Sequence, residues 1–445
     1  MTSTCISSWD VSALPAGLDE QRLQKIKDWL DSQISGNRLA GASLLIQRKG
    51  HCGLFGAAGI AGQTDSNQRL FDRETIVRLY SMTKPVTHVA AMMLHEQGCF
   101  QLDDPVARFL PAFSQMRVWT GEGSLDDDKQ IAANTVPARS LITVRQLMTH
   151  TAGLSYSFMN ATAVDQYYTD HNLVFPGTDE TLENLVERLA SAPLLCQPGT
   201  QWNYSVATDV LGRLVEVWSG QTLAKFFEQS IFKPLSMSST GFHVANENQH
   251  RFADLYGPAV GGDLGSLGKP ANDMNLSAYR DTSKVDAPPI ALDVVASTSF
   301  VNEPVLFSGG GGLTGSIDDY ARFCQMLLNK GALNGERLLG RKTVEFMRRN
   351  HLPDNADMAS LGQGVWSESS YTGIGFGLGF AVVLDPVKAG FVSSAGEHHW
   401  GGAASTFFWI DPEEELFVIF LTQLYPSSTY PIRQELRTRV YQALE

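Results

Sequence analysis

Serine and lysine residues three positions apart are the first feature of the sequence that could carry out chemistry. One turn of helix places a lysine amine on the same face as the oxygen of a serine three residues before it. A lysine that is partly removed from water has a lowered pKa, so it can take the serine proton and activate the serine as a nucleophile. The spacing occurs in three pairs, each followed by proline: Ser81 and Lys84, Ser230 and Lys233, and Ser266 and Lys269.

The residues after each pair single out Ser81 and Lys84. Apolar residues at helical spacing run from Val86 to Leu94, and Pro85 falls in the first turn of that predicted helix, where a missing N–H is tolerated. A serine at this helix start lies at the positive end of the helix dipole, and its own N–H can serve as an oxyanion donor. The other two pairs precede loop-like sequence. A helix N-cap beside a surface lysine remains the alternative for Ser81.

Tyr204 is a second candidate, because it lies where a loop leads into a predicted helix. It belongs to the segment Gln201–Ser205, which follows Pro198-Gly199. A tyrosine at such a junction can point into a cleft, and its phenolate beside a lysine is a competent base. A half-buried core tyrosine is the alternative.

A third candidate segment is His398-His399-Trp400-Gly401-Gly402-Ala403. Paired glycines let the backbone approach a ligand closely, and the N–H that follows them can point at an oxyanion. A bulge on an edge strand is the alternative. Adjacent histidines on a strand point to opposite faces, and no His-Glu-x-x-His occurs, so we expect no metal site here.

Two other patterns point away from familiar enzyme classes. The sequence has no Gly-x-Ser-x-Gly, which argues against the α/β-hydrolase arrangement. Gly310, Gly312 and Gly315 match the dinucleotide-binding glycine spacing, but the acidic first turn predicted after Ser316 would repel a pyrophosphate. We therefore expect no nucleotide and no other cofactor.

Charge and composition limit the partners of the chain. The 445 residues include 34 Lys and Arg against 47 Asp and Glu, a formal net charge of −13, which argues against nucleic acid and anionic lipid as partners. The N-terminus lacks the basic and apolar regions of a signal peptide, and no stretch approaches a membrane span. The five cysteines are scattered, as expected of reduced thiols. These features predict a cytoplasmic protein, and they do not define its oligomeric state.

Hydrophobic periodicity predicts elements of both types at the two ends of the chain. The predicted helices cover residues 23–34 (ended by Gly36), 86–94, 206–218 (ended by Gly220) and 432–444, and the predicted strands cover 42–47, 54–62, 377–384, 405–410 and 416–422. Between about residues 103 and 281, helical patterns alternate with polar loops. We predict a discontinuous α/β domain, 1–105 with 285–445, and an inserted helical domain, 106–284.

Taken together, Ser81-Met-Thr-Lys84, Tyr204-Ser-Val206 and Trp400-Gly-Gly402 resemble the motifs of the serine β-lactamase and penicillin-recognising superfamily, in the same order. The set is most similar to the family VIII carboxylesterases, which look like class C β-lactamases. The likeness runs from about residue 20 to the C-terminus and includes the flanks Leu141–Leu154 and Gly311–Ser316. It implies an α/β (α+β) fold of the β-lactamase type, with an antiparallel sheet flanked by helices, an all-helical domain and a site in the cleft between them.

The resemblance also implies a role for each matched residue. Ser81 would be the acyl-accepting nucleophile, and Lys84 and Tyr204 would share its proton and return it to the leaving group. The backbone N–H groups of Ser81 and Ala403 would form the oxyanion hole. The sequence leaves open whether Lys84 or Tyr204 is the base, since such a pair can titrate as one unit.

Two departures from the lactamase pattern shift the expected substrate. Val206 replaces an asparagine, and Trp400 replaces the lysine of the third motif, so both groups that help to hold a β-lactam are missing. An indole in place of a charge makes the pocket more apolar and suits a neutral ester. We therefore expect hydrolysis of short- to medium-chain carboxylic esters through an acyl-Ser81 intermediate.

Other functions remain as alternatives on the same fold. One is a transacylase, as in the fungal acyltransferases that acylate statin-type polyketides and share this layout. The others are a β-lactam or D-amino-acid peptide hydrolase and a non-catalytic ligand-binding relative. The segments 256–289 and 354–371 are candidate walls of the substrate pocket.

Overall fold

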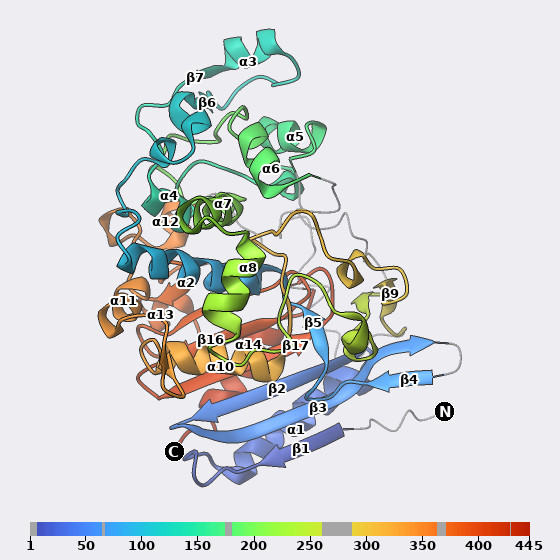
Figure 1. Ribbon diagram of the computed structural model, residues 1–445. Coiled ribbons are helices and arrows are strands. Elements are labelled where there is room, and N and C mark those ends of the chain that lie inside the picture. The colour runs from blue at the N-terminus through green and yellow to red at the C-terminus, as the bar shows by residue number, and fades with distance from the viewer. Residues whose placement is uncertain (1–6, 65–66, 174–179, 260–286, 363–370, 428) are drawn as a thin grey trace.

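An antiparallel sheet built from both ends of the chain is the central feature of the computed structural model (Figure 1), which describes residues 7–64, 67–173, 180–259, 287–362, 371–427 and 429–445. The described residues form nine strands in this sheet. Eight of them follow the order β1 (Ser7–Val11), β3 (His51–Thr64), β2 (Gly41–Arg48), β17 (Leu416–Thr422), β16 (Phe407–Asp411), β15 (His398–Gly401), β14 (Ala381–Val383) and β13 (Ile374–Phe376), and β4 (Asn67–Leu70) pairs with β3.

The pairing of β2 with β17 joins the N-terminal and C-terminal strands. Leu44 lies opposite Phe420, and Ile46 lies opposite Val418. Every residue of β17 is buried, because helices cover both faces of the sheet here. The predicted strands at 42–47, 54–62 and 416–422 are confirmed.

Helices from different parts of the chain cover the two faces of the sheet. On one face, α1 (Glu20–Ser35) and α14 (Ile432–Tyr441) bury Leu30 and Leu436 against Trp409 and Phe420. On the other face, α10 (Ile317–Leu328) packs on β17 and β2. The helix α2 (Thr83–Glu96) belongs to the same hydrophobic cluster as α10 and connects the sheet with the helical region above it (Figure 1).

Between residues 106 and 259 most of the regular elements are helices, and the part that carries α3, α5 and α6 lies at the top of Figure 1. Its helices are η2 (Val106–Arg108), η3 (Pro111–Gln115), α3 (Asp128–Asn134), α4 (Val144–Met148), η4 (Ser157–Met159), α5 (Ala163–Asp170), α6 (Leu182–Leu189), α7 (Ala207–Ser219), α8 (Leu223–Phe227), η5 (Glu228–Phe232) and η6 (Asn246–Arg251). The expected all-helical domain also contains a short ribbon, β6 (Arg117–Trp119) with β7 (Thr135–Pro137). Such a short ribbon leaves little sequence periodicity to detect.

Short elements complete the fold around the sheet. The paired strands are β5 (Ile76–Arg78) with β10 (Thr314–Ser316), β8 (Leu255–Gly257) with β9 (Ile290–Asp293), and β11 (Ala332–Leu333) with β12 (Glu336–Arg337). The remaining helices are η1 (Tyr80–Met82), η7 (Ser299–Val301), α11 (Arg341–Met347), η8 (Pro353–Asn355), α12 (Met358–Leu361) and α13 (Pro386–Ala389).

One predicted strand is too long, because only residues 381–383 of the expected 377–384 form a strand, β14. The sequence from Gly377 to Leu384 reads as a single strand, but the chain reverses there, between β13 and β14. Gly377 N–H bonds to the Phe380 carbonyl at 2.8 Å, and Gly379 has a φ of +101°, in the left-handed region that favours glycine. The glycines therefore make a turn inside a run whose apolar residues look continuous.

Glycines end two helices as predicted. Gly36 caps α1, and Gly220, with a left-handed backbone, caps α7. The strand predicted at 405–410 begins two residues later, because Ser405 has a φ of +64° and belongs to the preceding turn. The residue limits of the two predicted domains stay a prediction.

Among the described residues, no helix is both long and apolar enough to cross a bilayer. The four cysteines in this part of the chain, Cys52, Cys99, Cys196 and Cys324, are free thiols.

Candidate active site

Ser81 and Lys84 lie at the start of α2, where the sequence placed them. Ser81 belongs to the 3₁₀ turn η1, which leads directly into α2, and Pro85 is tolerated in the first turn of α2. Lys84 Nζ lies 3.2 Å from Ser81 Oγ and donates to the Gly310 carbonyl at 2.7 Å. Ser81 is partly exposed, whereas Lys84 is 1% exposed. A ligand can therefore reach the serine while the lysine stays out of water.

Tyr204 approaches Ser81 from the helical region, 123 positions along the chain. It ends the loop before α7, and its hydroxyl donates to Ser81 Oγ at 2.6 Å. Lys84 Nζ lies 4.6 Å from the centre of the Tyr204 ring, within cation–π distance. The structure thus brings Ser81, Lys84 and Tyr204 into one hydrogen-bonded group.

Burial changes the proton affinity of both groups beside Ser81. Desolvation lowers the pKa of Lys84 to about 7, against the opposing attraction of Asp209. Desolvation also raises the pKa of Tyr204, although hydrogen bonds with Ser81, Trp400 and Tyr156 offset part of the rise. At neutral pH the tyrosine is therefore a neutral phenol, while a substantial fraction of the lysine is a neutral amine.

Trp400 and the glycines after it lie against the serine segment. Trp400 is on β15, is 8% exposed and packs its ring 5.5 Å from that of Tyr204. After Gly401 the chain turns, and Gly402 N–H bonds to the Thr406 carbonyl at 2.8 Å. A Cβ on Gly402 would lie 2.3 Å from the carbonyl oxygen of Leu79, so a glycine is needed for this approach.

Ala403 follows in the same turn and is partly exposed. It packs in a small apolar cluster with Tyr80, the residue before the serine. No backbone hydrogen bond that we find outside the helices and strands uses the Ala403 N–H. The turn therefore packs against the segment that leads into Ser81.

Val206 lies next to this group rather than in it. It caps the N-terminus of α7, is 6% exposed and belongs to the main hydrophobic core. Its N–H bonds to the Ser155 carbonyl at 3.2 Å, which ties the Tyr204 segment to the loop that carries Tyr156.

The acidic and histidine residues before Trp400 form a structural network. Glu397 is fully buried and pairs with Arg437, with His399 at 3.0 Å and with the Tyr441 hydroxyl at 3.0 Å. His398 packs its ring against Phe380, away from His399. Within the described ranges, no group of three or more His, Cys, Asp or Glu side chains could hold a metal ion.

Two residues that sequence reasoning missed, Tyr156 and Gly310, contact the Ser81 group, and a third, Asp209, acts on Lys84 through its charge. Tyr156 is 3% exposed and forms a hydrogen bond with Tyr204, Gly310 accepts from Lys84, and Asp209 faces Lys84 from α7. Tyr156 comes two residues after the flank Leu141–Leu154 that supports the resemblance, but its spacing alone indicates no chemistry. The position of Asp209, five residues after Tyr204 at the start of a helix, could equally be an ordinary first-turn acid.

The other predicted patterns take no part in the site. Lys233 is exposed and pairs with Glu228, so Ser230 and Lys233 form no buried pair. Ser266 and Lys269 lie outside the described residues, as do residues 260–286 and 363–370 of the two candidate pocket-wall segments. Ser316 caps α10 and Asp318 lies in its first turn, as predicted from the sequence.

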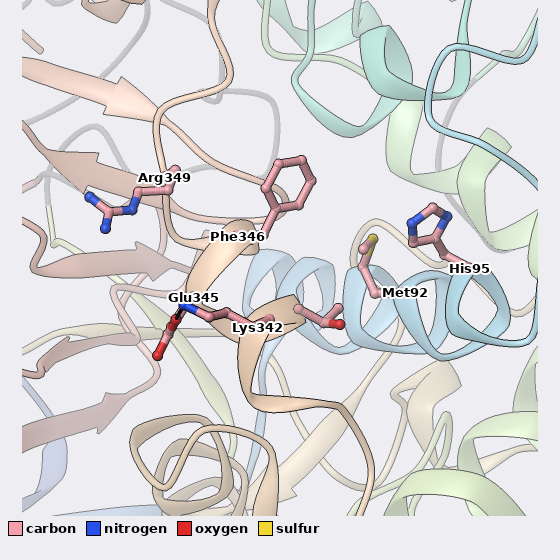
Figure 2. Close-up of a pocket in the computed structure, with 7 residues that line it drawn as sticks. Met92, His95, Lys342, Glu345, Phe346 and Arg349 are labelled. Atoms are coloured by element: carbon pink, nitrogen blue, oxygen red, sulfur yellow. Dashed lines mark hydrogen bonds and ion pairs between the residues drawn. The ribbon is translucent and has the colours of Figure 1, made fainter.

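Figure 2 shows a separate hollow of about 480 Å³ between α2 and α11. Met92 and His95 of α2 line it, together with Lys342, Phe346 and Arg349 of the α11 segment. Neither the serine, the lysine nor the tyrosine of the candidate site lines this hollow, so it is a distinct surface feature.

Comparison with known proteins assigns the fold and the family. The Beta-lactamase family model matches residues 23–442. Esterase EstB from Burkholderia gladioli is 32% identical over 443 residues, which cover 98% of this chain and 97% of that protein. A lovastatin esterase from Penicillium rubens is 29% identical over 361 residues, 77% of this chain and 78% of that protein.

Solved structures agree with this assignment. The structure of EstCE1, a hydrolase with promiscuous acyltransferase activity, matches with a TM-score of 0.72 at 28% identity and covers 95% of this chain and 99% of that chain. A structure of simvastatin synthase (LovD) from Aspergillus terreus matches with a TM-score of 0.73 at 23% identity, covering 95% and 97%, which shows the shared fold. The resemblance inferred from the three motifs is confirmed, and the chain belongs to the beta-lactamase family.

Proposed function

We propose that this chain is a serine esterase that transfers an acyl group from a carboxylic ester to Ser81 and then to water. The observation that carries the proposal is the arrangement around Ser81 Oγ, with Tyr204 at 2.6 Å and a buried Lys84 at 3.2 Å. An alcohol becomes a nucleophile only when a base within hydrogen-bond reach takes its proton. The relationship to EstB supports an ester as the substrate.

Acylation begins with Lys84 as a neutral amine. As Ser81 Oγ bonds to the ester carbonyl carbon, its proton passes to Lys84 Nζ, directly or through the Tyr204 hydroxyl, and the carbonyl π electrons move to oxygen. The raised pKa of Tyr204 favours Lys84 as the resting base, with Tyr204 as a neutral relay. Collapse of the tetrahedral intermediate then breaks the bond to the alcohol, which leaves with a proton from this pair.

Backbone N–H groups stabilise the developing oxyanion in this mechanism. We assign these donors to Ser81 and Ala403, because the close contact of Gly402 with Leu79 holds the Ala403 turn against the segment that leads into Ser81. Deacylation repeats the steps with water as the nucleophile, and the serine receives its proton back. No step in this scheme calls on a metal or cofactor.

Aromatic side chains around Tyr204 favour a neutral, apolar acyl group. The rings of Trp202, Phe376 and Trp400 surround Tyr204 and one another with centroids 5.3 to 6.4 Å apart. These rings are almost fully buried in the protein, and Trp400 puts an indole rather than a cation beside Tyr204, so this side of the site offers no charge to a carboxylate. We therefore propose short- to medium-chain esters as the substrates.

Acyl transfer to an alcohol is the second candidate function. It is favoured by the similarity to EstCE1, a hydrolase with promiscuous acyltransferase activity. The same acyl-enzyme serves both reactions, and the acceptor that reaches it decides between them.

Intact-protein mass spectrometry during turnover of p-nitrophenyl butyrate tests the proposal. We expect a butyryl adduct that maps to Ser81 and is lost, together with turnover, in Ser81→Ala. Nitrocefin in place of the ester should turn over slowly. Fast ester turnover by a folded Ser81→Ala protein would refute the mechanism, and fast nitrocefin turnover would indicate a true β-lactamase. Addition of methanol at constant ester concentration separates hydrolysis from transfer, because transfer yields methyl butyrate.

A further inference from the structure

A buried carboxylate, Asp209, faces Lys84 and has no part in the steps described above. It lies in the first turn of α7 and is 2% exposed. Its Oδ1 accepts from the Ser308 hydroxyl at 2.7 Å and from the Gly310 N–H at 3.1 Å. Its Oδ2 is buried without a hydrogen-bond partner among the described residues. Burying a half-satisfied carboxylate is costly, so this group calls for an explanation beyond packing.

The backbone of Gly310 connects Asp209 to Lys84. Its N–H donates to Asp209, and its carbonyl accepts from Lys84 Nζ at 2.7 Å. Through this connection, Asp209 fixes the carbonyl that holds the lysine amine beside Ser81.

The segment that includes Gly310 has little freedom to move. The neighbouring Gly309 is packed so closely that a Cβ on it would lie 2.8 Å from the Thr208 carbonyl oxygen and 3.2 Å from Thr87. The Thr87 hydroxyl also donates to the Gly309 carbonyl at 2.7 Å. Because α2 and α7 hold the segment from two sides, a change at Asp209 is transmitted to the lysine rather than absorbed by the loop.

Five titratable groups surround the lysine amine: Asp209 from α7, Tyr204 and Tyr156 from the adjoining loops, His88 from α2 and His150 from the segment after α4. Burial lowers the pKa of both histidines and raises the pKa of both tyrosines. All four are therefore neutral near neutral pH. Burial raises the pKa of Asp209 and lowers that of Lys84, so these two groups determine the charge of the site near neutral pH.

Building on the function proposed above, we propose that Asp209 is a positioning residue for the acyl transfer: it anchors the Gly310 carbonyl against Lys84 and places a buried negative charge beside the amine. When Ser81 attacks the ester, its proton makes Lys84 an ammonium ion in a poorly solvated site. The carboxylate stabilises that ion, because opposite charges attract strongly where water is excluded. When the proton leaves with the alcohol, the amine becomes neutral again, ready for water to attack.

The test is the pH dependence of kcat/KM for p-nitrophenyl butyrate in Asp209→Asn. Loss of the charge lowers the pKa of Lys84 further, so the acid limb of the profile moves to lower pH, by about one unit or more. The plateau falls about tenfold, because an amine of lower pKa is a weaker base. A merely structural defect would lower the plateau without moving the limb.

Asp319 offers a matched control. It is also a first-turn residue, in α10, is 2% exposed, and accepts from the Ser239 N–H at 2.7 Å and the Thr240 hydroxyl at 2.9 Å. We expect Asp319→Asn to keep the acid limb of the wild type, whatever stability it loses. An equal shift in both variants would contradict the proposal.

Ser308→Ala separates anchoring from charge, and it removes only a hydroxyl. We expect a plateau several-fold lower and an acid limb within a few tenths of a pH unit of the wild type. Two results would overturn the proposal. One is an acid limb in Ser308→Ala that is displaced as far as in Asp209→Asn, and the other is an acid limb in Asp209→Asn that stays at its wild-type pH. If the asparagine variant does not fold, Asp209→Ala makes the same test without a buried amide.

The Ser81 adduct distinguishes this failure from failure of the proposed function. If the wild type forms the butyryl-Ser81 adduct and the acid limb of Asp209→Asn does not move, Asp209 has no part in the mechanism and the esterase proposal stands. Absence of the adduct in the wild type would refute the function itself.

Discussion

Gly402→Ala tests whether the turn after β15 supplies an oxyanion donor. A Cβ at this position would lie 2.3 Å from both the Leu79 carbonyl oxygen and Thr406 Oγ1, whereas real Cβ atoms essentially never approach closer than 3.0 Å. Either the turn or the Leu79 segment must therefore move by about 0.7 Å or more. Leu79 comes two residues before Ser81, so the movement changes the distance between the Ala403 N–H and the serine.

The expected loss can be estimated from this displacement. An N–H donor moved by about 0.7 Å from an ideal distance no longer makes a good hydrogen bond. Loss of one oxyanion donor costs about 10² to 10³ in kcat. KM should change little, because the contact develops only as the carbonyl becomes tetrahedral. Overpacking should cost about 1–3 kcal/mol of unfolding free energy.

Stopped-flow acylation by p-nitrophenyl butyrate measures this effect directly. Gly241→Ala is the control, because a Cβ there meets its nearest atom, the His243 carbonyl oxygen, at an ordinary 3.5 Å. We expect wild-type acylation in the control and a loss of about 10²-fold in Gly402→Ala. A folded Gly402→Ala protein that acylates within about threefold of the wild-type rate would refute the role of this turn.

Three further perturbations follow from the site and its surroundings. Lys84→Ala and Tyr204→Phe should each lower kcat by about 10² or more. The two losses should be strongly non-additive in the double variant, because both residues act on the proton of the same serine. Single-turnover kinetics of the two single variants and the double variant measures this. Trp400→Lys should lower kcat/KM for butyrate esters by about tenfold or more, because it removes an N–H donor to Tyr204 and adds a cation beside Lys84. Burial would raise the pKa of Glu397, but the charges of Arg437 and His399 outweigh this effect and lower the pKa to about 2. The stability that this carboxylate contributes is therefore present above its unfolded pKa near 4.5 and is lost as the pH falls toward about 2. Glu397→Gln should therefore destabilise the protein most at pH 7 and less at pH 3 in denaturant titrations.

Each of these expectations has an outcome that contradicts it. Additive losses would mean that Lys84 and Tyr204 act in separate steps. Unchanged ester kinetics in Trp400→Lys would place the indole outside the site. An equal loss of stability at pH 7 and pH 3 would mean that Glu397 contributes through packing rather than charge.

Local sequence pattern predicted much of the fold and part of the site. The spacing of Ser81 and Lys84, with Pro85 in the first helical turn, already requires both side chains to share one helix face. The helix end at Gly220 follows from the left-handed conformation that glycine adopts freely, whereas Gly36 ends α1 with a φ of −87°, which any residue can adopt. The strand predicted at 377–384 was too long, because a glycine turn occupies its first residues and only 381–383 form β14.

The group at Ser81 depends on contacts between distant parts of the chain. Tyr204 comes from the helical region and Gly310 from the segment before α10, yet both contact the Ser81 and Lys84 pair. From its position before a helix, Tyr204 was a candidate with a half-buried core tyrosine as the alternative, and the resemblance of its motif to a known one favoured the catalytic role. Tyr156 and Asp209 carry no such local signal, and only the packing of α7 and its neighbouring loops places them there.

The sequence by itself determined which residues could react, since residue type and helical spacing are local properties. The tertiary structure decided how they react. Desolvation lowers the pKa of Lys84 and raises that of Tyr204, and neither change can be read from neighbours along the chain. The physical reason is that desolvation depends on every segment that packs around a group, and those segments are brought together only when the whole sheet and its helices assemble.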